Sequence, residues 1–190
     1  MKENIKLGLI LFAVTAIAGL CLGFAHEITR VPIEKQIVET NNNAMREVLP
    51  EASEFKLSDV IIPGEGAVKE VNEGYKDGKS IGYAIKVITK GYGGPIEMMV
   101  GISNDGILQG MKILSHSETP GLGANAPKPE FSGQFKNKPI ENGIEVVTAG
   151  ASQKNQVDAM TGATITSKRV TNGVNQAIKF YTSNLKGGQK

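Results

Sequence analysis

The chain has 190 residues, with 21 Lys and Arg against 19 Asp and Glu, and a formal net charge of +2. This near-balance, without a dense basic cluster, argues against a nucleic-acid partner. Cys21 is the only cysteine, which excludes an intrachain disulfide and a four-cysteine iron–sulfur cluster. The length suits one membrane anchor followed by one domain of ordinary size.

The first element is an uncharged apolar run from Leu7 to Ala25, long enough to cross a hydrocarbon core as a helix. A cleaved signal peptide is the alternative, because Gly23-Phe24-Ala25 resembles a cleavage site, but the apolar part of a signal is shorter, about 7–15 residues. A lipoprotein signal at Cys21 is rejected, since Leu20 stands where a small residue is required. We therefore expect an anchor over residues 1–29 that contacts the lipid bilayer.

The rest of the chain predicts one helix, a run of strands and a closing helix. An amphipathic helix is expected over 33–49, ended by Pro50. The turn sequence Asn104-Asp105-Gly106 joins two of the predicted strands into a hairpin. Strands are predicted over 55–62, 67–71, 80–89, 96–102, 107–114 and 144–148, and the closing helix over 167–183.

Antiparallel strands flanked by helices indicate an α+β fold. The expected architecture is a single N-terminal transmembrane helix followed by one antiparallel-sheet domain with flanking helices. We place this domain at residues 30–185 and a disordered tail at 186–190, where the sequence ends in Lys-Gly-Gly-Gln-Lys.

The loop from His116 to Gly123 (His-Ser-Glu-Thr-Pro-Gly-Leu-Gly) follows a predicted apolar strand and is dense in polar and turn residues. Its glycines permit backbone conformations closed to other residues, and Pro120 fixes φ. Such a loop can direct its own N–H groups and the side chains of Ser117, Glu118 and Thr119 at one ligand. A solvated connection between two elements remains the alternative interpretation.

The segment Asp158 to Ser167 places four hydroxyl residues around a Gly-Ala pair, immediately before the closing helix. The N-terminus of a helix offers unpaired N–H groups and the positive end of its dipole to a phosphate. An ordinary capped helix start would use the same residue types. The four hydroxyl residues are Thr161, Thr164, Thr166 and Ser167.

No other cluster in the sequence points to a metal or to catalysis. His26 lies at the membrane boundary, and His116 has no evident His or Cys partner in the sequence. A nucleophilic triad, a P-loop and a Rossmann fingerprint are all missing from the sequence, so no catalytic residue is assigned. Phe131 and Phe135 fit one helical face and are interpreted as core.

Together, the loop and the hydroxyl segment resemble the G subunit of the Rnf complex, a membrane-bound, ion-translocating electron-transfer complex between ferredoxin and NAD. One step further out, the chain is similar to the C subunit of the sodium-translocating NADH:quinone reductase. Both belong to the FMN-binding domain family, whose hallmark Ser/Thr-Gly-Ala-Thr is matched by Thr161-Gly162-Ala163-Thr164. The chain lacks the longer insertions of the quinone-reductase protein, which favours the Rnf family and leaves the other as the alternative.

The resemblance implies that Thr164 carries FMN through a phosphoester bond made by a separate flavin transferase. It further implies that Asp158 is part of the pattern that this transferase recognises. Tyr92, within a Gly-Tyr-Gly-Gly stretch, is expected near the flavin ring, with a plain turn as the alternative there. The cofactor-binding residues expected from the resemblance are Thr161, Gly162, Ala163, Thr164, Thr166, Glu118, Thr119, Gly121, Leu122 and Tyr92.

The function implied by the resemblance is that of an electron carrier within a larger complex. The chain would pass electrons through its flavin, and alone it would turn over no substrate. Its expected partners are the other Rnf subunits, the transferase during maturation and the bilayer, with the domain outside the cytoplasmic membrane. A cofactor-free, membrane-tethered binding or assembly module is the rival hypothesis, and a redox sensor would need an output domain that the sequence lacks.

Overall fold

The computed structural model describes residues 2–187. The chain divides into two compact units, Met1–Thr40 and Asn41–Lys190. The helix that begins in the first unit continues into the second, and the boundary expected after residue 29 lies within this helix. The expected tail over 186–190 falls largely outside the described residues.

The helix α1 runs without a break over Lys2–Val48. The helix expected over 33–49 is confirmed over residues 33–48, together with its end just before Pro50, but these residues continue α1 and do not start a new helix. Pro32 lies inside α1, where it removes one backbone donor without ending the helix. Among the described residues, α1 is the one helix long and apolar enough to cross a membrane. Its apolar side chains between Ile5 and Phe24 are mostly exposed, as a lipid-facing helix requires.

The second unit is built on a six-stranded antiparallel sheet in which the strands follow one another in sequence order. The type of fold expected from the sequence is thus confirmed. The turn between β2 and β3 has positive φ at both Asp77 and Gly78, the usual chemistry of a tight hairpin. The strands are β1 (Glu54–Leu57), β2 (Val68–Lys76), β3 (Lys79–Lys90), β4 (Pro95–Ser103), β5 (Ile107–His116) and β6 (Lys138–Pro139).

The structure corrects two of the strand predictions, one of them through a second, two-stranded sheet. The strand expected over 144–148 forms as β7 (Glu145–Val147), but it is not the last strand. It pairs in parallel with β8 (Gln156–Asp158), three residues that carry too little alternation to be recognised in the sequence. The strand expected over 55–62 is also shorter and ends at Leu57.

Side chains of the large sheet alternate between two faces, and each face has its own core. One face packs against α3 (Thr164–Phe180) and the segment that precedes it, which includes Phe131 and Phe135. The ring centroids of these two phenylalanines lie 5.5 Å apart, as the prediction of core packing requires. The opposite face, with Ala84 and Met99, is covered by residues 44–49 at the end of α1 and just beyond it.

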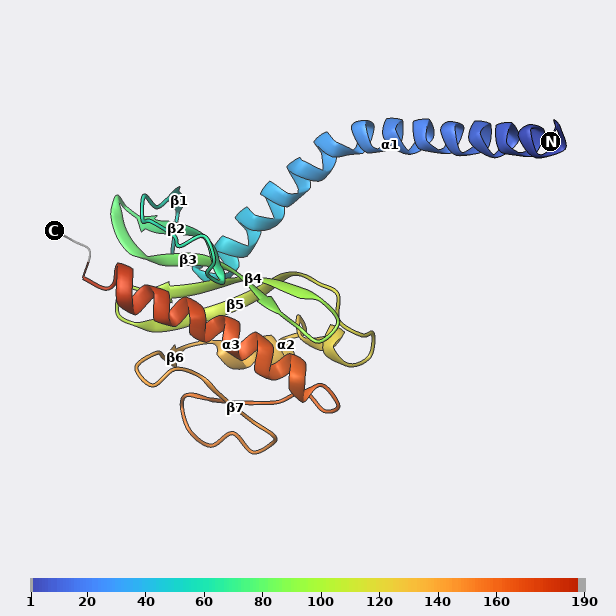
Figure 1. Ribbon diagram of the computed structural model, residues 1–190. Helices are drawn as coiled ribbons and strands as arrows, with labels where there is room; N and C mark the ends of the chain where they lie inside the picture. Colours follow the sequence, from blue (N-terminus) through green and yellow to red (C-terminus); the bar gives the residue numbers. More distant parts are fainter. Residues whose placement is uncertain (1, 188–190) are drawn as a thin grey trace. The chain divides into compact units, whose positions relative to one another are not determined.

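The helix α3 lies along the sheet and brings its first turn to one end of it (Figure 1). Its buried positions Val170, Val174 and Ala177 recur at intervals of three and four, so that one face of the helix points at the strands. Between β5 and β6, the chain forms three short helical turns, η1 (Gly123–Asn125), α2 (Pro129–Ser132) and η2 (Gly133–Phe135). The chain leaves α3 through η3 (Tyr181–Leu185).

Candidate functional site

The first turn of α3 has the features of an open helix N-terminus. Thr164 is its first residue, and the N-cap position is held by Ala163, whose methyl side chain accepts no hydrogen bond. Gly162 adopts a φ of +73°, a conformation that other residues rarely take, so the motif needs glycine at this position. The expected start at residue 167 was three residues too late. The consequence is that Thr164 stands where unpaired backbone N–H groups point outward.

The four hydroxyl residues of this segment fall into two pairs. Thr166 and Ser167 are buried and bonded within the fold: the Thr166 hydroxyl donates to Glu118 Oε2, and Ser167 Oγ accepts the Met160 N–H at 2.9 Å. Thr161 and Thr164 are exposed, and neither side chain makes a hydrogen bond to another described residue. The hydroxyl groups left free for a ligand are therefore those of Thr161 and Thr164.

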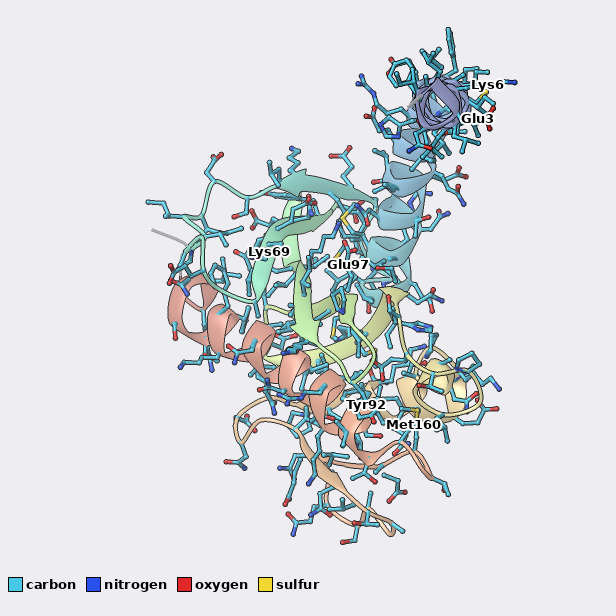
Figure 2. All side chains as sticks on the ribbon, turned by 45° about the vertical axis from the view of Figure 1, so that its right-hand side comes forward. Glu3, Lys6, Lys69, Tyr92, Glu97 and Met160 are labelled. Carbon is cyan, nitrogen blue, oxygen red and sulfur yellow. The ribbon has the colours of Figure 1, made fainter. Side chains whose placement is uncertain are left out.

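Beside this turn lies a cavity of about 400 Å³ whose wall comes from three segments far apart in the sequence. These are the loop between β3 and β4, the loop after β5 and the first turn of α3. Figure 2 labels Tyr92, which lies on the first of these loops and lines the cavity together with Thr164 at the start of α3. The lining residues are Tyr92, Glu118, Thr119, Leu122, Gly123, Gly162, Ala163, Thr164, Ile165 and Thr166.

Most of the residues expected to bind the cofactor lie on this wall, and two do not. Thr161 and Gly121 are neighbours of lining residues without lining the cavity themselves. Gly123 and Ile165 line it and were not singled out, although both lie within the two segments on which the prediction rests. The side chain of Ile165 is half exposed, which its apolar residue type gives no reason to expect.

The mouth of the cavity carries exposed apolar side chains, an uncommon feature in the second unit. Tyr92 is 70% exposed, and Leu122 and Ile165 also present large apolar surface. Around them lie polar backbone at the start of α3 and the buried carboxylate of Glu118. The cavity thus joins the start of a helix, where backbone N–H groups favour an anion, to an apolar rim on which a flat ring could lie.

Asp158 lies at the end of β8, half-buried and bonded to the fold. Its Oδ1 accepts the backbone N–H of Ala151 at 2.8 Å. Its own backbone N–H donates to Gln134 Oε1 at 2.7 Å, so the strand end is held from both sides. Asp158 is thus a structural residue of the segment before α3 as well as a member of the expected recognition pattern.

The histidine of the 116–123 loop supports the backbone of its own loop. His116 Nδ1 accepts the N–H of Glu118 at 3.2 Å, which shapes the start of the loop.

Among the described residues, His, Cys, Asp and Glu side chains form no group of three that could ligate a metal ion.

The chain matches the FMN-binding domain family over residues 91–179, a range that contains every residue lining the cavity. It is 38% identical to the G subunit of the Na⁺-translocating ferredoxin:NAD⁺ oxidoreductase complex of Acetobacterium woodii, over 95% of this chain and 92% of the relative. The chain belongs to the G-subunit family of ion-translocating oxidoreductase complexes. A further member, the G subunit of the proton-translocating complex of Clostridium ljungdahlii, is 39% identical over 88% of this chain and 85% of the relative.

Solved structures show the same fold as this member of the G-subunit family. The C subunit of the Na⁺-translocating NADH-quinone reductase from Parabacteroides distasonis superposes with a TM-score of 0.57 at 24% identity, covering 78% of this chain and 96% of that chain. NqrC of Shewanella oneidensis gives 0.55 at 20% identity, covering 76% and 92%. The resemblance to the Rnf protein is confirmed, and the likeness to the quinone-reductase protein is one of fold.

Proposed function

We propose that this chain is the FMN-carrying electron-transfer subunit of a membrane-bound, ion-translocating ferredoxin:NAD oxidoreductase complex. The observation that carries the proposal is the exposed Thr164 hydroxyl, at the uncapped start of α3, on the wall of the 400 Å³ cavity. The relatives named as G subunits of such complexes support the larger assembly, whose other subunits would be the partners of this chain.

The residues present fit FMN at both of its ends. The outward N–H groups of the first turn of α3 would hold the phosphate, with the helix dipole favouring its negative charge. Tyr92, Leu122 and Ile165 offer exposed apolar surface on which a flavin ring would lie. When bound, FMN supplies the ability to take up and release electrons, and the chain holds it in place.

We further propose that the attachment is covalent, through Thr164. A phosphoester between Thr164 Oγ1 and the FMN phosphorus, formed with the overall loss of one water, would keep the cofactor on an exposed domain. The neighbouring hydroxyl groups support this choice, since Thr166 and Ser167 are buried and already bonded. A flavin transferase would make the bond and recognise Asp158, six residues before the acceptor.

We also propose that the chain is anchored in the membrane by its N-terminal helix, in one orientation. Residues 1–29 would cross the cytoplasmic membrane once, with the flavin domain of residues 30–185 on the extracytoplasmic side and the tail of 186–190 after it. Lys2, Lys6 and the amino terminus precede the apolar run, with Glu3 among them, and Arg30 and Lys35 follow it. Because positive charge favours the cytoplasmic side, this small asymmetry slightly supports a cytoplasmic N-terminus. Labelling of domain lysines in intact cells by a membrane-impermeant reagent checks this orientation.

Intact mass and in-gel flavin fluorescence, on full-length protein expressed in membranes with a flavin transferase, test the proposal. We expect a gain of one FMN less one water, which Thr164→Ser retains and Thr164→Ala abolishes. Because the Thr164 side chain is exposed and has no hydrogen bond to another described residue, Thr164→Ala should change the stability by about 1 kcal/mol or less. An unmodified wild-type mass beside an active transferase would leave a noncovalent flavin or a cofactor-free binding module.

A further inference from the structure

Glu118 is a buried carboxylate at the junction of the three segments that form the cavity wall. Its side chain is 6% exposed, and both of its oxygens accept hydrogen bonds from the chain itself. Oε1 accepts the backbone N–H groups of Tyr92 at 2.8 Å and Gly93 at 3.0 Å. Oε2 accepts the hydroxyl of Thr166 in the first turn of α3. One side chain therefore connects the β3–β4 loop, its own loop and the helix start.

Two glycines, Gly91 and Gly123, lie directly against the carboxylate of Glu118. A Cβ added to Gly91 would overlap Glu118 Oε1, and a Cβ added to Gly123 would overlap Oε2 and the Thr166 hydroxyl. These two glycines thus make room for the Glu118 side chain. Gly91 and Gly123, one in each loop, therefore serve the packing inside the protein.

Bonds from neutral donors to a carboxylate are stronger than bonds between neutral groups, and they strengthen further where water is excluded. The partners of Glu118 lie 26, 25 and 48 residues away along the chain, so each bond restrains a segment that local structure leaves free. Because both of its oxygens accept these hydrogen bonds, Glu118 restrains two of the segments that form the cavity wall.

We propose that Glu118 is a positioning residue: its carboxylate holds Tyr92 and the first turn of α3 in one geometry, so that the ring end and the phosphate end of the cavity are preformed. The proposal rests on the proposed function of the cavity as the FMN site. It differs from a direct role for Glu118 against the flavin, in which the negative charge itself would matter.

Two substitutions separate the two roles. In Glu118→Gln, the amide oxygen still accepts from Tyr92 and Gly93, and the amide nitrogen can donate to Thr166 Oγ1, so the connections persist without the charge. In Glu118→Ala all three connections are lost. Hydrogen exchange by mass spectrometry on full-length, flavin-free protein in detergent measures the Tyr92 and Gly93 amides directly.

We expect exchange at Tyr92 and Gly93 to be about tenfold or more faster in Glu118→Ala, the loss usual for a bond to a charged group, and near the wild-type rate in Glu118→Gln. Unchanged exchange in Glu118→Ala would overturn the proposal. Because this measurement requires no FMN, its result is independent of whether Thr164 carries a flavin.

The flavin-loaded protein provides a second readout, the midpoint potential of the flavin. A positioning role predicts a potential near wild type in Glu118→Gln and a shifted one in Glu118→Ala. Equal shifts in both variants would mean that the charge acts on the flavin, against the proposal.

If Glu118→Ala does not fold, the Thr166 variants replace it in the hydrogen-exchange experiment. Thr166→Val removes one donor to Glu118 and should still speed exchange at Tyr92, whereas Thr166→Ser should restore the wild-type rate. Equal exchange rates in Thr166→Val and Thr166→Ser would overturn the proposal that Glu118 connects Tyr92 to the first turn of α3.

Discussion

The two ends of α3 use their polar groups in opposite ways. At the C-terminal end, Tyr181 is buried, its hydroxyl donates to the carbonyl of Asn104 at 3.1 Å, and its ring centroid lies 6.0 Å from that of Tyr83. At the N-terminal end, the helix has no side-chain cap, and the hydroxyl of Thr164 is exposed beside a cavity. One end of the helix is thus bonded into the fold, and the other presents unpaired groups to a ligand.

This difference indicates how the domain combines stability with a binding site. Unpaired N–H groups and a missing cap are unfavourable for an isolated helix, typically by about 1 kcal/mol for the cap. The closely packed C-terminal half and the two buried hydroxyl residues of the first turn hold the helix in place nonetheless. Local departures from good helix chemistry of this kind are expected at functional sites.

We expect the largest effect, a loss of stability, from removing a hydrogen-bonded hydroxyl group at the N-terminal end of α3. Ser167→Ala leaves the half-buried N–H of Met160 without its acceptor, so the free energy of unfolding should fall by about 1–3 kcal/mol. Urea unfolding of the full-length protein in detergent measures this loss. The matched control is Thr161→Ala, an exposed hydroxyl without a partner among the described residues, which should stay within about 0.5 kcal/mol of wild type.

A sharper test at the same end concerns Asp158, which has both a structural bond and the expected recognition role. Asp158→Asn keeps an oxygen to accept the Ala151 N–H but removes the charge, and Asp158→Ala removes both. We expect both variants to fold, with a stability loss of about 1 kcal/mol in Asp158→Ala, and both to be flavinylated more slowly. Flavin incorporation is followed by intact mass over time. Normal incorporation into Asp158→Ala would refute the recognition role.

The smallest expected effect lies at the C-terminal end and is confined to high pH. Burial, with the nearby charge of Glu73, raises the pKa of Tyr83 to about 12 from its usual 10.0. The folded state therefore holds this proton more tightly than the unfolded state, so the stabilisation is complete below pH 10 and is lost between about pH 10 and 12. Partial exposure to solvent keeps the effect small.

Tyr83→Phe should accordingly reduce the slope of stability against pH between about 10 and 12, while Tyr75 and Tyr181, whose pKa values are also raised, keep part of it. Denaturant unfolding at a series of pH values measures the slope. A slope identical to that of wild type would show that Tyr83 does not titrate differently in the folded and unfolded states.

Much of the fold could be predicted because its signals are local. Alternation indicated β3, and the turn sequence Asn104-Asp105-Gly106 indicated the hairpin of β4 and β5. The spacing of Val170, Val174 and Ala177 indicated α3. Two features were not predicted from the sequence. The strand β8 has only three residues, and α1 continues through Pro32 without the break that a proline suggests. In these places, pairing across the fold and neighbouring helical turns outweigh local preference.

The sequence by itself determined the class of the protein, its apolar N-terminal helix and the two segments in which the site residues lie, because composition, periodicity and motif spacing are local properties. Only the tertiary structure decided which hydroxyl groups are free and which are bonded, and it alone placed Glu118 between Tyr92 and Thr166. Those contacts join residues 26 and 48 positions apart. Pairings at such separations depend on how the sheet and α3 pack, which no local pattern in the sequence specifies.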